Sequence, residues 1–114
     1  MKLEDFESVL KEQFKTSEEI LVIKAKEYAT SDRLHNFNIA AALKGETPMQ
    51  ALAGMMAKHT VSIYDMCMSH KEYPAEMWNE KITDHINYLI LLKAIVTEEQ
   101  KMSANPEQFD IPVK

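Results

Sequence analysis

Four acidic side chains, spread over three expected helices, are of the type that binds a divalent metal ion. Glu27 lies near the end of one helix, Asp65 lies in a second, and Glu80 and Asp84 lie one turn apart in a third. Carboxylates from facing helices of a bundle commonly hold metal ions, and Mg²⁺ prefers oxygen ligands. These four residues are therefore candidate ligands of a magnesium ion. On a solvent-exposed surface, the same carboxylates would only form a solvated face.

Asp84 stands out because of its place on its helix. Glu80, Asp84 and Asn87 follow one stripe of that helix, and beyond them the helix becomes apolar on almost every side. Asp84 and Asn87 thus lie on a line that becomes buried one turn later. A carboxylate at such a boundary needs a metal ion, a cation or hydrogen bonds. The alternative is a structural ion pair between Asp84 and either Lys81 or Lys58.

Side chains suited to a phosphate or another polar ligand gather in the loop between the second and third expected helices. This loop combines a cation in Arg33, hydrogen-bonding groups and the aromatic ring of Phe37. Such loops often bind ligands when a rigid scaffold positions them, and arginine suits phosphate. We expect Phe37 itself to pack in the core. The candidate ligand-binding residues of the whole chain are Lys26, Arg33, His35, Asn36, Lys58 and Asn87.

A second polar line follows another expected helix. Lys58 shares a face with Ser62 and Asp65, at spacings of four and three residues. Lys58 could contact phosphate, pair with Asp65 or Asp84, or remain solvated. His59 lies one step away, inside an apolar stripe, where a histidine is more often a core residue than a ligand.

The composition predicts an all-α fold that positions these residues. Of 114 residues, only two are glycine and four are proline, whereas residues that favour helices are abundant. The length suits one domain, and we expect it over residues 1–102, followed by an irregular tail over 103–114. The apolar spacing predicts an antiparallel bundle of four to five helices. Their expected ranges are 3–14, 17–29, 36–43, 48–69 and 75–99.

Local signals set most of these boundaries. Thr16 stands three residues before Glu19, which is the spacing of a capping box at the start of the second helix. Gly45 fits the left-handed stop position of the third helix. Thr47–Pro48 reads as an N-cap followed by the first helical residue, and Pro74 separates the last two helices.

Charge and cysteine content exclude several classes of function. The net charge is −5 and the basic residues form no cluster, so we expect no binding to duplex nucleic acid. A single cysteine, Cys67, allows no disulfide within one chain, and we expect its side chain to be buried. No apolar run is long enough to span a bilayer. These features favour the cytoplasm. The last helix carries more apolar surface than a monomer of this size covers, so we expect a homo-oligomer, either a dimer or a tetramer.

Several segments, together spanning most of residues 20–94, form a recognisable pattern; they are 26–28, 33–37, 40–45, 47–48, 51–55, 58–59, 62–66 and 78–89. These segments resemble small phage and prophage proteins of the nucleotide-modification-associated group. They are also distantly similar to the all-α nucleotide pyrophosphohydrolases of the MazG and dimeric dUTPase group. The resemblance implies a protein encoded by a phage or prophage and acting in the bacterial cytoplasm.

The MazG-type enzymes hold magnesium with one helix bearing Glu-x-x-Glu and a later helix bearing Glu-x-x-Asp. Asp84 matches the last aspartate and is followed by a matching Asn-Tyr-Leu run. Lys81 stands where the preceding acid is expected, although Glu80 is adjacent. Glu19 and Glu27 are eight residues apart instead of three. A magnesium site is therefore either rebuilt from Glu27, Asp65, Glu80 and Asp84 or lost.

The resemblance implies a Mg²⁺-dependent (deoxy)nucleoside triphosphate pyrophosphohydrolase. Glu27 and Asp84 are then the candidate catalytic carboxylates, and Arg33 and Lys58 steady the triphosphate. The products are a nucleoside monophosphate and pyrophosphate. The alternative is a non-catalytic nucleotide-binding or protein-interaction module on the same fold, which Lys81 and the methionine-rich helix faces favour.

Overall fold

The computed structural model describes residues 1–27 and 32–104, except for the side chains of Lys24 and Glu27. All regular elements in these ranges are helical, and none is a strand, so the all-α prediction is confirmed. In chain order the elements are α1 (Leu3–Glu18), the π-helical segment η1 (Glu19–Ile23), the 3-10 segment η2 (Lys24–Glu27), α2 (His35–Lys44), α3 (Pro48–Met68) and α4 (Ala75–Ala104).

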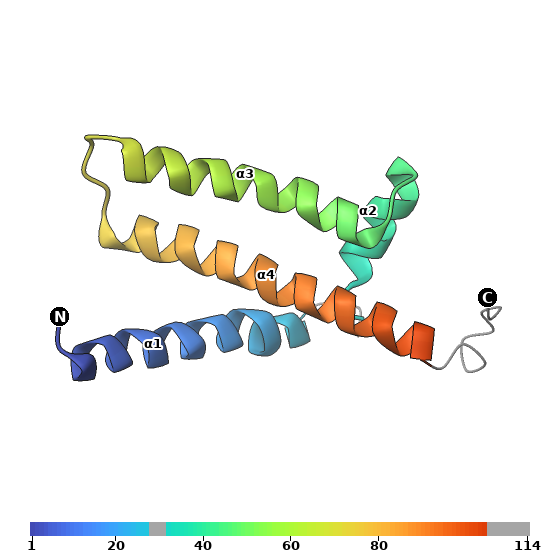
Figure 1. Cartoon of the computed structure of the whole chain (residues 1–114), viewed down its shortest axis with the longest axis horizontal. Helices are drawn as coiled ribbons and strands as arrows, with labels where there is room; N and C mark the ends of the chain where they lie inside the picture. Colours follow the sequence, from blue (N-terminus) through green and yellow to red (C-terminus); the bar gives the residue numbers. More distant parts are fainter. Residues whose placement is uncertain (28–31, 105–114) are drawn as a thin grey trace.

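The long helix α4 lies between the other two long helices (Figure 1). α3 runs antiparallel to α4 on one side, and α1 lies on the other side, running in the same direction as α4. The short helix α2 crosses the far end of the pair, where it contacts α3. No helix in the described part of the chain is long and apolar enough to cross a bilayer.

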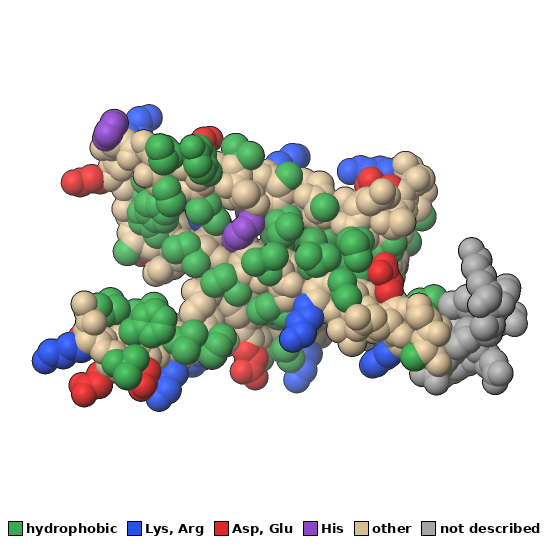
Figure 2. Space-filling view, viewed as in Figure 1, with side chains coloured by type: hydrophobic (Ala, Val, Ile, Leu, Met, Phe, Trp, Pro, Cys, Tyr) green, Lys and Arg blue, Asp and Glu red, His purple; other side chains and the backbone are tan. Residues whose placement is uncertain are grey.

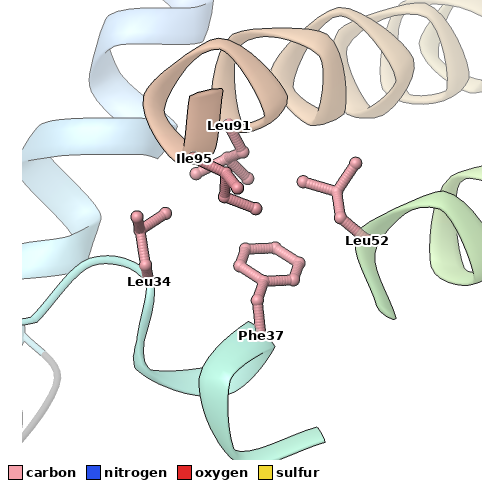
Figure 3. Packing of buried hydrophobic residues seen from close by; sticks show 5 residues of the cluster. All are labelled: Leu34, Phe37, Leu52, Leu91 and Ile95. Atoms are coloured by element: carbon pink, nitrogen blue, oxygen red, sulfur yellow. The ribbon is translucent and has the colours of Figure 1, made fainter. Parts of the chain in front are cut away.

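The buried core lies at the end of the molecule where α2 crosses. Its five members come from the loop before α2, from α2, from α3 and from α4, and their side chains point toward one another (Figure 3). Phe37 is buried among them, as its position in the sequence predicted. The cluster consists of Leu34, Phe37, Leu52, Leu91 and Ile95.

The predicted boundaries around α3 are confirmed. Thr47 and Gln50 form a reciprocal capping box, in which the backbone N–H of Gln50 donates to Thr47 Oγ1 at 3.1 Å and that of Thr47 donates to Gln50 Oε1 at 2.9 Å. Gly45, just after α2, has a φ of 67°, the left-handed conformation that glycine adopts without strain. α4 begins directly after Pro74 and runs to Ala104, five residues beyond its expected end. Residues 105–114 of the expected tail lie outside the described residues.

The predicted break before the second helix is wrong. α1 continues through Thr16 to Glu18 and leads directly into η1. Thr16 Oγ1 donates to the backbone carbonyl of Glu12 at 3.0 Å. Its hydroxyl therefore bonds within α1 instead of capping the start of a new helix. A threonine hydroxyl bonds equally well backward along a helix or forward as a cap, and the sequence spacing does not distinguish the two.

Two expected burial patterns are also corrected. The apolar spacing of the last helix predicts a buried face that includes Ile82 and Leu89, yet both are exposed. The buried line of α4 lies further round the helix and begins with two polar residues; its members are Thr83, Asn87, Leu91 and Ile95. A helix that is apolar on almost every side has no hydrophobic period that marks its buried face. The helices that pack against it decide which face is buried. Cys67 is exposed rather than buried.

Replacing Thr47 with alanine should lower the free energy of unfolding by about 1 kcal/mol, because the backbone N–H of Gln50 loses the hydroxyl that caps it. Urea unfolding followed by circular dichroism measures this. The matched control is Thr60→Ala in the middle of the same helix, where the hydroxyl only bonds back to the Met56 carbonyl. The control should be neutral or slightly stabilising, since alanine favours helix. Equal losses in the two variants would contradict the capping role.

Candidate functional site

Asp84 lies on the face of α4 that carries the core further along the helix. Leu91 and Ile95 follow it by seven and eleven residues, which are close to two and three helical turns. The three side chains therefore leave α4 in nearly the same direction. Leu91 and Ile95 are buried, whereas Asp84 is half-buried. Asp84 therefore stands at the boundary between the buried part of this line and the more exposed surface of α4.

A polar cluster joins α1 to α4 beside this position. Gln13 Nε2 on α1 donates to Ser17 Oγ at 3.1 Å and to Thr83 Oγ1 on α4 at 3.0 Å. Ser17 and Thr83 are both buried. One amide nitrogen thus satisfies two buried hydroxyl groups, as buried polar atoms require. This cluster holds the C-terminal half of α1 against α4.

Asn87 differs from these partnered residues. It follows Thr83 by one turn, and only 5% of its surface is exposed. Its amide nitrogen and its amide oxygen are both buried, and neither has a hydrogen-bond partner among the described residues. Each such atom costs about 1–3 kcal/mol unless something else bonds to it. The amide therefore offers one donor and one acceptor, side by side, to a water or a ligand.

Close to Asp84 along α4, the helices α3 and α4 contact each other through an aromatic pair. The rings of His59 on α3 and Tyr88 on α4 have centroids 4.9 Å apart and are tilted by 44°. The Nδ1 atoms of His59 and His85 are buried and lack a hydrogen-bond partner among the described residues. His59 is half-buried in the apolar line of α3 that the sequence predicted. A carboxylate, an amide and two rings thus come from five consecutive residues of α4 and the adjacent turn of α3.

The loop before α2 forms an open groove with the C-terminal half of α4. Three cations and two carboxylates line it, together with uncharged residues. Arg33 Nε donates to the backbone carbonyl of Leu21 at 3.1 Å, which ties this loop to η1. Cations grouped in a groove favour an anion such as phosphate. The charged lining residues are Asp32, Arg33, Lys93, Glu98 and Lys101.

The structure places the predicted site residues in different parts of the molecule. Asp84 and Asn87 are brought together at the boundary of the core, and Arg33 reaches the groove. The side chain of Glu27 lies outside the described residues. The remaining candidates lie in exposed positions, where the structure gives them no shared pocket; they are Lys26, His35, Asn36, Lys58, Asp65 and Glu80.

The magnesium site needs at least three ligands from the protein or its substrate. Among the side chains that the structure describes, no three His, Cys, Asp or Glu residues are grouped so that they could hold a metal ion. Asp65, Glu80 and Asp84 therefore do not form such a site by themselves. With Glu27 undescribed, the four-carboxylate site stays a prediction, and the described residues alone do not fit it.

Comparison with known proteins does not assign this chain to a family. No family model, curated protein or solved structure matches this chain. The likeness to the nucleotide-modification-associated and MazG-type proteins thus rests on the sequence segments alone.

Sequence reasoning missed the hydrogen-bonded cluster between α1 and α4. Gln13, Ser17 and Thr83 carry no motif and look like ordinary helix-surface residues. One signal was present, since Thr83 and Asn87 are four residues apart and share a face of α4. The position of α1 was needed to show that this face is buried.

Proposed function

We propose that this chain binds a (deoxy)nucleoside triphosphate beside the middle of α4 and hydrolyses it to a nucleoside monophosphate and pyrophosphate. The observation that carries the proposal is the buried amide of Asn87, which offers an unused donor and acceptor three residues after the half-buried Asp84. A nucleobase edge presents the complementary pattern, because adjacent acceptor and donor groups pair with an Asn amide in a bidentate manner.

Two further features support a nucleotide as the ligand. The His59–Tyr88 pair provides aromatic surface on which a base can stack. Arg33, Lys93 and Lys101 provide positive charge in the groove further along α4. The MazG-like bundle arrangement, the phage origin and the bacterial cytoplasm belong to the same proposal and rest on the resemblance.

Magnesium is part of this proposal. Glu80 and Asp84, one turn apart, supply two carboxylates, and any further ligands have to come from Glu27, from phosphate oxygens or from water.

A panel of ribo- and deoxyribonucleoside triphosphates, each with and without Mg²⁺, tests the proposal. We expect pyrophosphate release with at least one nucleotide only when Mg²⁺ is present, together with a rise in the melting temperature. Asp84→Asn should lower turnover at least about 100-fold. The matched control, Glu76→Gln in the exposed first turn of α4, should leave turnover unchanged. Neither turnover nor a thermal shift with any nucleotide would contradict the proposal.

A second candidate function is nucleotide binding without catalysis, or an interaction module on the same fold. The observation that favours it is the lack of a three-ligand metal cluster among the described side chains. The same experiment separates the two functions. A thermal shift without pyrophosphate release supports binding alone, whereas Mg²⁺-dependent release supports the enzyme.

A further inference from the structure

The first helix exposes an apolar stripe that no other described residue covers. Leu3, Phe6, Leu10 and Phe14 recur at spacings of three, four and four residues, and their exposed fractions are 71%, 55%, 42% and 65%. Ser17 continues the same stripe and is buried against α4. α1 therefore meets α4 at its C-terminal end, and the two helices diverge toward the N-terminus of α1 (Figure 1).

The stripe is large enough to matter for association. With about 200 Å² for a fully exposed large apolar side chain, the four residues expose on the order of 500 Å² in each copy. This is more than half of the roughly 800 Å² per partner of a standard protein interface. A patch of this size matches the largest apolar patch of a typical monomeric protein, and such patches are often functional.

One flank of the stripe carries charges in an ordered sequence. Glu4 and Glu7 precede Lys11 and Lys15, at spacings of three, four and four residues, so all four lie along the same side of the apolar stripe. Figure 2 shows acidic and basic side chains beside the hydrophobic ones on α1. The first half of this flank is acidic and the second half is basic.

This order of charges is self-complementary when two copies of α1 lie antiparallel. In an antiparallel pair related by a two-fold axis, each flank faces the same flank of the other copy in the reverse direction. Glu4 and Glu7 of one copy then lie beside Lys15 and Lys11 of the second copy. In a parallel pair, this flank would instead lie beside the opposite flank of the second copy, so the glutamates and lysines would not pair with one another.

The apolar residues agree with the same register. When Leu3 lies opposite Phe14 of the second copy, Phe6 lies opposite Leu10 of the second copy. The large and small side chains then alternate along the contact, and both ends of the stripe are covered. Apolar spacing and charge order thus select the same partner, which is another copy of this chain.

We propose that two copies of this chain pair through an antiparallel contact between their α1 helices, with the stripe Leu3, Phe6, Leu10 and Phe14 at its centre. The contact is isologous, so each copy contributes the same surface. It does not depend on the proposed nucleotide-binding function, and neither Asp84 nor Asn87 takes part in it.

Light scattering after gel filtration tests the apolar part. The wild-type chain should have the mass of a dimer, and the double variant Phe6→Glu/Phe14→Glu should have the mass of a monomer with unchanged helix content by circular dichroism. The matched control is Leu43→Glu on α2, whose side chain is 82% exposed, and it should remain a dimer. A monomeric wild type, or a dimer that survives the double substitution, would overturn the proposal.

Charge reversal tests the antiparallel arrangement. Glu4→Lys/Glu7→Lys makes the whole flank basic, and Lys11→Glu/Lys15→Glu makes it acidic. Each variant alone should self-associate at least about tenfold more weakly than the wild type. An equimolar mixture should form a heterodimer of near wild-type affinity. Failure of the mixture to recover affinity would show that these charges act only within their own helix, and the antiparallel contact would be rejected.

Discussion

Replacing Leu52 with alanine should lower the free energy of unfolding by about 3 to 5 kcal/mol. Leu52 is completely buried, and its side chain points from α3 into the cluster formed with Phe37, Leu91 and Ile95 (Figure 3). Truncation removes apolar contacts and leaves a cavity where three elements meet. Because the core has only five main members, few others remain to hold α2 against the α3–α4 pair. Urea unfolding at one fixed protein concentration measures the change.

The matched control is Leu43→Ala on α2. This substitution removes the same atoms from a side chain that is 82% exposed, so the stability should change by less than about 0.5 kcal/mol. Both variants lose the same atoms, so the difference between their free energies of unfolding measures the effect of burial alone. If the two substitutions lowered the free energy of unfolding equally, the cluster at the α2 end would not be the part of the molecule that stabilises the fold.

The boundaries that sequence predicted correctly are those with a short-range physical cause. Gly45 ends α2 because few other residues adopt its φ, and Pro48 begins α3 because its fixed φ suits the first turn. Pro74 separates α3 from α4 by disfavouring helical angles in the residue before it. Each signal acts within a few residues of the chain, so no knowledge of the tertiary fold is needed.

The predictions that failed rest on sequence patterns that fit more than one arrangement. Thr16 had the spacing of a cap, but its hydroxyl bonds back to Glu12 and the helix continues. The side of α4 that carries Ile82 and Leu89 was expected to be buried because apolar residues surround the helix, whereas the position of α1 decides that Thr83 is covered. Sequence periodicity identifies a buried face only when the opposite face is polar.

The burial of the candidate site residues could be predicted in part. The stripe through Asp84 and Asn87 was expected to become buried along the helix, and the structure confirms a half-buried Asp84 followed by a buried Asn87. The roles of both residues in binding or catalysis stay predictions. That the Asn87 amide lacks a partner could not be predicted, since it depends on which atoms of α1 and α4 approach it.

Replacing Asn87 with leucine should raise the free energy of unfolding by about 1–3 kcal/mol and weaken nucleotide binding about 100-fold. In the free protein, the two amide atoms are buried without a hydrogen-bond partner among the residues that the structure describes, and an apolar side chain of similar size removes that cost. In the complex, the same change leaves the polar groups of a bound ligand unpaired. Urea unfolding measures the first effect, and titration calorimetry with the nucleotide found in the panel measures the second.

The sign of the stability change is the informative quantity, and Thr83→Val provides the contrast one turn earlier. Thr83 is as deeply buried as Asn87, but its hydroxyl accepts a hydrogen bond from Gln13 at 3.0 Å. Valine has nearly the same shape and leaves that amide without one of its acceptors, so stability should fall by about 1 kcal/mol while nucleotide binding stays unchanged. Two buried polar residues on one line of α4 thus respond in opposite directions to apolar replacement. If Asn87→Leu lowers stability as Thr83→Val does, the amide is satisfied by water within the fold and serves structure rather than ligand recognition.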